Sequence, residues 1–411
     1  MTTTQTWADL YRDLHAHPEL SFQETRTAGI VAERLAALGF EVTTGVGVTG
    51  VVGVLANGDG PTVLLRADMD ALPVEERTGL DYASTQRGVS DEGVDVAVMH
   101  ACGHDVHVTC LLGACAALAE DRTTWTGTVL AVFQPAEEKG TGAQAMIEDG
   151  LFSRFPTPVV VLGQHVAPLP AGVIGLRSGP TFAAADTLRI TLHGQGAHGS
   201  RPEASVDPIV MAAATVMRLQ TIVSREVGGA ETAVVTVGTI HAGSAANIIP
   251  ADAELVLNVR TFTDDVRSRV IDAIGRIARA EAAASGAPRE PDIESLNSFP
   301  AVVNDPDAVE RTRGALQEAA GFVVDPGSIT GSEDVGMLAS AAGAPCVYWL
   351  LGGAEHSAFE GATTMEQLAE RVRTIPSNHS PLFAPVIEPT LTVGIAALVA
   401  AAREWLRADG P

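Results

Sequence analysis

The alternation of apolar and polar residues along the chain predicts an α/β protein. Residues 7–38 carry apolar side chains at helical spacing, with a break at 17–19. Apolar runs at 62–67, 128–133 and 159–162 have the length and composition of buried strands. Further elements are expected as a strand at 344–351 and helices at 106–120, 306–320 and 389–406. We expect the strands to form an open mixed sheet with helices on both faces.

The pattern changes between residues 185 and 297. This stretch reads as strand, helix, strand, strand, helix and strand, at 187–192, 206–223, 233–239, 253–260, 264–285 and 292–296. A βαββαβ order is typical of a small ferredoxin-like domain with its own core. Apolar strands of the first kind return after it. The sequence therefore predicts a discontinuous larger domain, 1–184 and 298–411, with the domain 185–297 inserted into it.

Three apolar strands are each followed by polar, metal-competent residues. Asp68 and Asp70 follow the run at 62–67, Glu137 and Glu138 follow 128–133, and His165 follows 159–162. Open α/β sheets place their chemistry just beyond the carboxyl ends of the strands. We therefore expect these side chains to gather at one edge of the sheet.

A dense group of metal donors lies at residues 99–107, which hold one cysteine, three histidines and an aspartate. Thiolate and imidazole are the usual ligands of zinc-like divalent cations. The alternative is a buried cysteine among surface histidines, but further donors recur downstream at strand ends. The candidate ligands are Cys102, His104, Glu138, His165 and His379. Five donors exceed the four of one tetrahedral zinc ion and suit two divalent ions that share a bridging group and a water.

A water activated by two metals needs a base within hydrogen-bond reach, and the adjacent pair Glu137 and Glu138 can supply one. On a loop at a strand end, Glu138 can bind metal while Glu137 acts as the general base. The other interpretation of such a pair is a solvated surface patch. Four further residues could orient the ligand imidazoles, or could equally be helix caps or surface groups: Asp68, Asp70, Asp105 and His107.

Three polar residues of the inserted domain are candidates for substrate contact. His198 lies on a glycine-rich loop, so that it could reach a substrate when the domains close, or could simply be exposed. Asn247 precedes a short apolar run, and Arg260 ends a predicted strand. Arginine is the natural partner of a substrate carboxylate because its fork binds both oxygens.

Composition narrows the class of partner. The net charge of −24 argues against nucleic acid or an anionic membrane surface. No apolar run reaches the ~20 residues of a membrane helix, and the first residues lack the form of a signal peptide. Four cysteines in 411 residues are no disulfide framework. We therefore expect a cytoplasmic protein.

Several motifs in a fixed order resemble the M20 family of metallopeptidases and amidohydrolases. They are HPELS at 17–21, RADMDALP at 66–73, MHACGHD at 99–105, FQPAEE at 133–138, GSED at 331–334 and NHS at 378–380. Within the family, the chain is most similar to the subgroup of bacterial aminoacylases, hippurate hydrolases and plant auxin-conjugate hydrolases. The match covers nearly the whole chain.

The resemblance implies roles for individual residues. The family's ligand set falls on Cys102, His104, Glu138, His165 and His379, its catalytic glutamate on Glu137 and its supporting aspartate on Asp70. The inserted domain resembles the family's lid or dimerisation domain. In it, His198 corresponds to the histidine that polarises the scissile carbonyl, sometimes across a dimer interface, and Asn247 and Arg260 correspond to substrate-binding positions. Peptidase relatives carry His-x-Asp where this chain has Asp68-Met69-Asp70, so Asp68 is not assigned as a ligand.

Together these features predict a metal-dependent amidohydrolase that cleaves N-acyl-L-amino acids to a carboxylic acid and a free amino acid. Metal-activated water would attack the amide carbonyl. Two divalent ions per chain are expected, Zn²⁺ first and Mn²⁺ or Co²⁺ as alternatives, in a homodimer formed through the inserted domain. One alternative is a dipeptidase or carboxypeptidase on the same scaffold. The other is a non-catalytic metal-dependent binding protein, which would not need a poised base.

Overall fold

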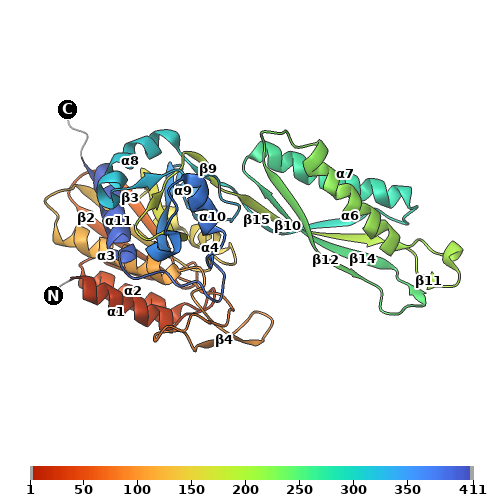
Figure 1. The fold of residues 1–411 in the computed structure, drawn as a ribbon, viewed down its shortest axis with the longest axis horizontal. Coiled ribbons are helices and arrows are strands. Elements are labelled where there is room, and N and C mark those ends of the chain that lie inside the picture. Colours follow the sequence, from red (N-terminus) through yellow and green to blue (C-terminus); the bar gives the residue numbers. More distant parts are fainter. Residues whose placement is uncertain (1–2, 408–411) are drawn as a thin grey trace. The chain divides into compact units, whose positions relative to one another are not determined.

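The structure is a computed structural model that describes the backbone of residues 3–407 and the side chains of residues 7–364 and 366–407. The chain forms two compact units. Among the described residues, unit 1 contains those up to Gly179, Val303–Gly327 and those from Asp334 onward, and unit 2 contains Pro180–Val302 and Ser328–Glu333. Figure 1 shows the helices and strands of both units.

Unit 1 is built on one mixed eight-stranded sheet. The order across the sheet is β1 (Glu41–Val46), β2 (Gly50–Asn57), β6 (Gly127–Gln134), β3 (Thr62–Asp68), β7 (Val160–Pro170), β18 (Cys346–Ala354), β8 (Ile174–Gly175) and β17 (Val323–Val324). The four central strands, from β6 to β18, run parallel, whereas β2 is antiparallel to β6 and β8 to β18. The predicted α/β fold with a large mixed sheet is confirmed.

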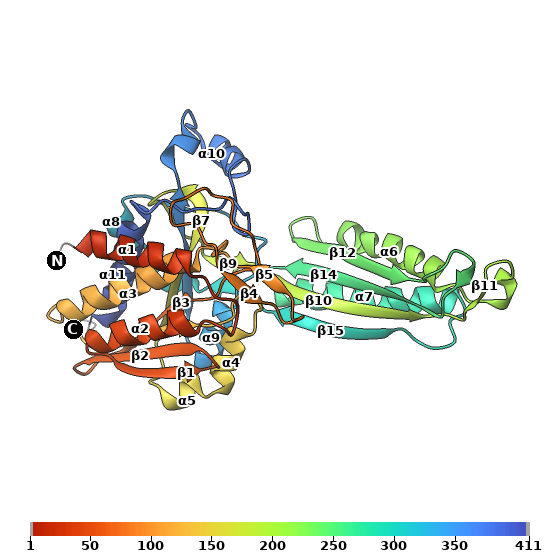
Figure 2. The same ribbon diagram turned by 90° about the horizontal axis from the view of Figure 1, so that it is seen from below.

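Helices cover both faces of this sheet. One face shares a hydrophobic core with α1 (Thr3–Ala16), α2 (Thr25–Ala37), α3 (His104–Glu120), α8 (Pro306–Ala320) and α11 (Thr390–Leu406). In both views α1, α2 and α3 lie side by side (Figures 1 and 2). Residues that point to the other face, such as Leu64, Leu130 and Val161, are also fully buried. There α4 (Gly142–Glu148) contacts β6, and α9 (Val335–Ala342) contacts β7.

The predicted end of strand β7 was wrong, and this error concerns a candidate metal ligand. The apolar run at 159–162 indicates a strand that ends before His165, but β7 continues to Pro170. Its pairing with β18 extends past the apolar run, and His165 lies opposite Leu350. His165 therefore projects from a paired strand rather than from a loop, which fixes its backbone more firmly. The other elements of unit 1 and its boundaries are short: β4 (Arg87–Val89), β5 (Asp95–Ala97), α5 (Leu151–Arg154), β9 (Gly179–Phe182), β16 (Val302–Asn304), η2 (His356–Phe359) and α10 (Met365–Val372).

Unit 2 is a four-stranded antiparallel sheet with two helices. The strand order is β12 (Ala233–Ala242), β14 (Asp252–Thr261), β10 (Ala184–His193) and β15 (Asp292–Phe299). Helices α6 (Pro208–Arg225) and α7 (Asp264–Ala284) pack on it and share its apolar core. Their first turns are capped by the side chains of Asp207 and Thr263. A small ribbon of β11 (Ala197–His198) and β13 (Ile248–Ile249), and the turn η1 (Pro202–Ala204), complete the unit.

All four cysteines are buried and free of disulfides. In the part of the chain that the structure describes, no helix is long and apolar enough to cross a membrane.

A buried histidine joins the N-terminal helix to the start of α3. Nδ1 of His15 lies 2.7 Å from Oδ2 of Asp105, and Nε2 lies 3.0 Å from Oε1 of Glu76. The rings of Tyr11 and Tyr82 lie 5.6 and 5.3 Å from the imidazole. Burial opposes the charged ring, but the two carboxylates outweigh burial and raise the pKa of His15 to about 10. His15 is thus a buried cation between two carboxylates.

We predict that His15→Ala lowers the free energy of unfolding by about 3–5 kcal/mol near neutral pH, because it leaves two buried carboxylates without their cation. The pKa is raised on folding, so the contribution is complete below the unfolded value near 6.5 and is lost as pH rises through about 10. The tyrosines, whose pKa values are raised by burial, stay neutral in this range. The buried ring of His100, whose pKa burial lowers to about 4, also stays neutral.

Denaturant unfolding of wild type and variant across this pH range measures the effect. His17→Ala is the matched control, because His17 follows α1, is 41% exposed at its side chain and has its Nδ1 2.7 Å from the carbonyl oxygen of Asp13. A loss of stability in His15→Ala that does not change with pH would contradict the assignment.

Candidate metal and catalytic site

The five predicted metal ligands come from separate segments of unit 1. Cys102 lies just before α3, and His104 is the first residue of that helix. Gly103 between them has φ of 83°, and a Cβ there would lie 2.3 Å from Cγ1 of Val166, so this turn requires glycine. The other three are Glu138 after β6, His165 in β7 and His379 in the loop before α11.

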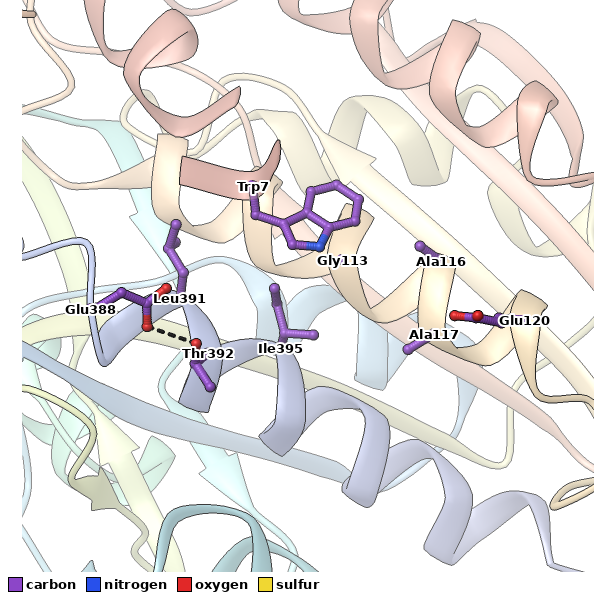
Figure 3. A pocket seen from close by; sticks show the side chains of 9 residues that line it. All are labelled: Trp7, Gly113, Ala116, Ala117, Glu120, Glu388, Leu391, Thr392 and Ile395. Atoms are coloured by element: carbon purple, nitrogen blue, oxygen red, sulfur yellow. Dashed lines mark hydrogen bonds between the residues drawn. The ribbon is translucent and has the colours of Figure 1, made fainter. Parts of the chain in front are cut away.

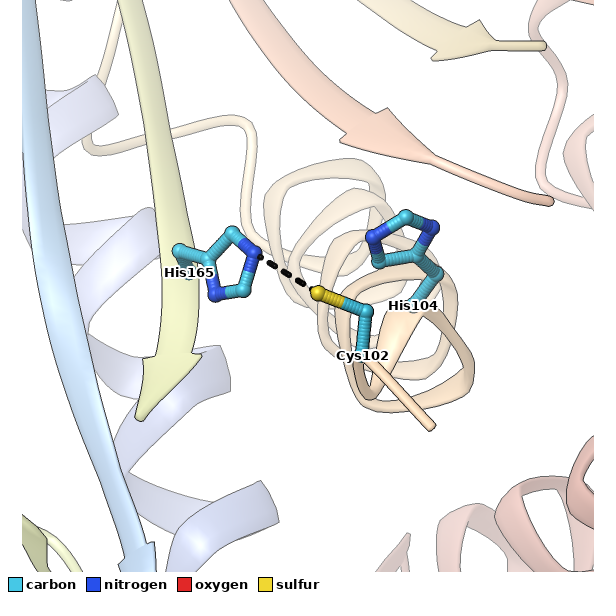
Figure 4. Close-up of side chains that lie close together, drawn as sticks. All are labelled: Cys102, His104 and His165. Atoms are coloured by element: carbon cyan, nitrogen blue, oxygen red, sulfur yellow. Dashed lines mark hydrogen bonds between the residues drawn. The ribbon is translucent and has the colours of Figure 1, made fainter. Parts of the chain in front are cut away.

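The structure brings all five together in two groups that share one residue. Ligand atoms of Cys102, His104 and His165 lie within 4.8 Å of one another, and so do those of Cys102, Glu138 and His379. Sγ of Cys102 lies 3.5 Å from Nε2 of His165 (Figure 4), and Nε2 of His379 lies 3.4 Å from Oε2 of Glu138. Two groups with a common thiol match the donor arrangement of two cations bridged by one ligand.

Two atoms inside these groups are buried without a hydrogen-bond partner, Nε2 of His104 and Oε1 of Glu138. An unpaired buried polar atom costs about 1–3 kcal/mol. The two atoms lie 3.8 Å apart, too far for a hydrogen bond. Thiol, imidazole and carboxylate are ligands of zinc and of similar divalent metals. The residues present therefore fit a pair of divalent cations.

Backbone contacts fix the orientation of two ligand residues. Nδ1 of His165 lies 2.8 Å from the carbonyl oxygen of Val166, so this nitrogen carries the proton and Nε2 faces Cys102. His379 has a left-handed backbone with φ of 71°, and its N–H donates to the carbonyl of Ala101 at 2.8 Å. The side-chain amide of Asn378 donates to the carbonyls of Cys102 and Val166, both at 3.1 Å. Asn378 thus ties the loop of His379 to the cysteine.

Asp70 is the central anchor of the site. One oxygen lies 3.2 Å from Nδ1 of His104, so the proton is on that nitrogen and Nε2 is left to bind metal. The two oxygens also accept the backbone N–H groups of Glu137 and Glu138, at 3.1 and 3.0 Å. Ser21 donates its hydroxyl to Asp70 at 2.6 Å. Asp70 therefore orients one ligand ring and the loop that carries both glutamates.

The other three orienting candidates have different roles. Oδ1 of Asp68 lies 2.5 Å from Nδ1 of His107, and its Oδ2 accepts from the buried guanidinium of Arg66 at 2.7 Å. Nε2 of His107 accepts the N–H of Val166 at 2.8 Å, so both of its ring nitrogens are occupied within the chain. Asp105 bonds to His15 rather than to a ligand imidazole. These three residues support the backbone around the site.

Several carboxylates give the site a strongly negative electrostatic potential. Burial and the charges of Glu138 and Glu137 raise the pKa of the Cys102 thiol well above its usual value. Burial alone would lower the pKa of His104, but nearby carboxylates, Asp68 first among them, raise it to about 10. Buried carboxylates contribute to both shifts, and their field favours bound cations.

Glu137 lies beside the ligands without joining either group that contains Cys102. Its side chain is largely buried, and Oε2 lies 3.8 Å from Nε2 of His104. Glu137 and Glu138 form a further donor group with His104, all within 4.8 Å. The two adjacent carboxylates therefore reach the same small volume from one loop.

The candidates in unit 2 do not form one group. The ribbon of β11 and β13 pairs His198 with Ile248, and the carbonyl of Asn247 accepts the N–H of Gly199 at 2.7 Å, so His198 and Asn247 are near neighbours. Arg260 is on β14, opposite Ala185. Both His198 and Asn247 are exposed, and Arg260 is half-buried.

One cavity of about 320 Å³ lies elsewhere in unit 1 (Figure 3). Its lining comes from α1, α3 and α11 together with Glu388 just before α11, and includes Trp7, Leu391 and Ile395. None of the predicted site residues lines it. The cavity is therefore not part of the candidate metal site.

An α/β sheet with thiol, imidazole and carboxylate donors gathered beside its parallel strands is an arrangement that suits a metal-dependent hydrolase. The chain belongs to peptidase family M20/M25/M40, whose sequence profile matches residues 64–376. The predicted resemblance to the M20 family is confirmed.

Three relatives and one solved structure illustrate the range of the family. The chain is 38% identical over 347 residues to thermostable carboxypeptidase 1 of Saccharolobus solfataricus, covering 83% of this chain and 84% of that protein. Identity is 38% over 325 residues to N-acetyl-L-cysteine deacetylase of Bacillus subtilis (79% and 75%), and 40% over 314 residues to hippurate hydrolase of Campylobacter jejuni (75% and 77%). A dinuclear metal-binding peptidase of the M20 family from Bacillus subtilis superposes with a TM-score of 0.77 at 30% identity, covering 98% of both chains.

Sequence reasoning missed several residues that support the site. Ser21, Glu24 and Asn378 contact Asp70, Ala136 and Cys102, respectively. Ser21 belongs to the HPELS motif and Asn378 to the NHS motif. Their roles could have been suspected from those motifs, but hydrogen bonds across such sequence distances leave no periodic pattern.

We predict that Cys102→Ala loses both metals, whereas His165→Ala and His379→Ala each lose one, because only Cys102 belongs to both donor groups. Metal per chain, measured by elemental analysis after dialysis, should fall from about two in the wild type. Cys110→Ala is the control, since Cys110 is buried in α3 outside both groups. Full metal content in Cys102→Ala would show that the thiol is not shared.

Proposed function

We propose that the protein is a metal-dependent aminoacylase, which hydrolyses N-acyl-L-amino acids to a carboxylic acid and a free amino acid. The observation that carries the proposal is Glu137, a carboxylate poised beside two donor groups that share Cys102. A purely metal-binding protein would need no such base. The deacetylase and the hippurate hydrolase among the relatives support an acylated amino acid as substrate.

Each residue of the site has a separate role in the proposed reaction. When bound, two divalent cations, Zn²⁺ first and Mn²⁺ or Co²⁺ as alternatives, would lower the pKa of a water and polarise the amide carbonyl. Glu137 accepts a proton from the attacking water and returns it to the leaving nitrogen. Asp70 keeps Glu137 in place through its backbone N–H. Nδ1 of His198 accepts the N–H of Ser200 at 3.2 Å and lies 2.7 Å from the hydroxyl oxygen of Ser200, which leaves Nε2–H to donate toward the developing oxyanion.

Arg260 is the proposed partner of the substrate carboxylate. Its Nε donates to Oδ1 of Asn258 at 2.8 Å, while Nη1 is buried without a hydrogen-bond partner. Burial also lowers the pKa of this guanidinium. A carboxylate that binds there would relieve the cost of an unpaired donor, about 1–3 kcal/mol. Asn247 is proposed as a second polar contact to the substrate.

A dipeptidase or carboxypeptidase is the second candidate. It is favoured by the identity of 38% to a thermostable carboxypeptidase. Both substrate classes end in a carboxylate that Arg260 could bind, and they differ at the other end, where a peptide carries a free amine. The two candidates are therefore separated by the acyl side of the substrate.

We predict that Glu137→Gln keeps its metal but loses about 10²–10⁴-fold in kcat, because the amide cannot take up the proton. The assay compares N-acetyl and N-benzoyl amino acids with dipeptides and is paired with metal analysis. Glu120→Gln, an exposed change at the end of α3, is the control. Near-normal turnover in Glu137→Gln would remove Glu137 from the mechanism, and wild-type turnover of dipeptides alone would favour the peptidase.

The strand register of unit 2 supports a homodimer that completes the active site. Arg260 lies opposite Ala185 at the end of β10 where the chain enters the unit. At the other end, His193 lies opposite Asp252 and leads into β11, which both views show beyond that end of the sheet (Figures 1 and 2). Arg260 lies eight residue steps along β14 from Asp252, about 26 Å at 3.3 Å per residue. One small substrate cannot span His198 and Arg260 of the same chain.

We therefore propose that His198 and Asn247 act at the site of the partner subunit. Unit 2 offers a surface for this contact: within the described residues β12 is an edge strand, paired only with β14. Ile240 on β12 is 53% exposed, and Met217 and Val210 on α6 are 72% and 65% exposed. An open strand edge with exposed apolar side chains is a favourable place for a second chain to pair.

A heterodimer of one His198→Ala chain and one Glu137→Gln chain tests this proposal. If His198 acts in the partner's site, one of the two sites keeps both residues, and the heterodimer should show about half of the wild-type kcat. The two homodimers, isolated from the same co-expression with two tags, are the inactive controls. A heterodimer as inactive as both homodimers would mean that His198 serves its own subunit.

A further inference from the structure

Glu24 is a buried carboxylate that the proposed chemistry does not use. It occupies the N-cap position of α2, yet its side chain makes no capping hydrogen bond. Glu19 takes that role instead, because its two oxygens accept the N–H groups of Arg26 and Thr27, both at 2.8 Å. Glu24 is turned inward and has no solvent exposure. Its side chain must therefore serve something other than its own helix.

The carboxylate of Glu24 binds the loop that carries the two glutamates. Its Oε1 accepts the backbone N–H of Ala136 at 2.9 Å, and Oε2 accepts the hydroxyl of Thr49 at 2.5 Å. The next two N–H groups, of Glu137 and Glu138, are bound by Asp70. Two buried carboxylates thus hold three consecutive N–H groups directly after β6.

The backbone at Ala136 needs this support. Its φ of 48° lies in the left-handed region, which costs an alanine roughly 1–2 kcal/mol. The carbonyl of Ala136 accepts the N–H of Gly142 at 3.2 Å, so both sides of the residue are held. The left-handed turn breaks the alternation of side chains along a strand. As a result, Glu137 and Glu138 can face the same donor group.

Stability alone does not explain a carboxylate at this position. A buried ion costs several kcal/mol in desolvation, and apolar residues of similar volume are often neutral or stabilising in its place. Burial, with a contribution from the charge of Asp70, raises the pKa of Glu24 to about 7. The free-energy cost of burying the Glu24 carboxylate is consistent with a role in shaping the turn at Ala136.

We infer that Glu24 is a positioning residue that sets the left-handed turn at Ala136 and thereby aims Glu137 and Glu138 into the metal site. The part that concerns Glu137 rests on the proposed function. The part that concerns Glu138 rests only on metal binding and can be measured without any substrate.

Three variants separate positioning from general stability. Glu24→Met fills the same space but offers no acceptor to Ala136. Glu24→Gln keeps one oxygen for Ala136 and is the rescue variant, since Thr49 can turn to accept from the amide. Thr49→Val removes the other hydrogen bond of Glu24 and is the matched control for the loss of a buried contact.

Apoprotein of each variant is titrated with Co²⁺, followed by the absorption of the cobalt–thiolate bond, and kcat and KM are measured on N-acyl amino acids. Glu24→Met should weaken the binding of one of the two ions about 10- to 100-fold and lower kcat by a similar factor, as for other outer partners of metal ligands. KM should change little. Glu24→Gln and Thr49→Val should stay close to wild type in both measurements.

Wild-type Co²⁺ affinity in Glu24→Met would overturn the inference, as would an equal loss in Thr49→Val. If Glu24→Met does not fold, Glu24→Asp, which is one methylene too short to reach Ala136, takes its place with the same expected losses. If wild-type protein hydrolyses no N-acyl amino acid, the proposed function fails while the cobalt titration still decides the role of Glu24.

Discussion

Negative charge buried at one end of the unit 1 sheet is the constraint on which the rest of the structure depends. Asp68, Asp105 and Glu24 are each at most 1% exposed. Carboxylates in such surroundings persist only with cations or hydrogen-bond donors beside them. Arg66 binds Asp68 of its own strand and Asp334, and His15 binds Asp105, so that the second and third of these pairs join segments distant in sequence. At the centre, the two donor groups that have Cys102 in common are available to bind divalent cations.

The same constraint explains how one short loop performs two tasks. The backbone after β6 is held by carboxylates on both sides, through Glu24 at Ala136 and through Asp70 at the next two residues. Neighbouring side chains on an ordinary strand would point to opposite faces. Because the left-handed turn removes that restriction, one glutamate can bind metal while the other remains beside the reacting water.

The sequence predicts features that are local and misses those that join distant segments. The central strands and the donor-rich stretch around Cys102 are visible because apolar runs and donor density are properties of a few neighbouring residues. The full length of β7 is not visible, because its extension depends on pairing with β18. The contacts of Glu24 with Ala136 and of His15 with Asp105 span 112 and 90 residues, and no pattern in the chain announces them.

In the proposed site, Cys102 would be a ligand shared by two metal ions. Anomalous diffraction from crystals of the metal-loaded protein, recorded on both sides of the metal absorption edge, tests it most directly. The account predicts two anomalous peaks per chain, each about 2.3 Å from Sγ of Cys102 if the metal is zinc. One ion would lie beside His104 and His165 and the other beside Glu138 and His379. A single peak, or two peaks with Cys102 bound to neither or only one, would contradict it.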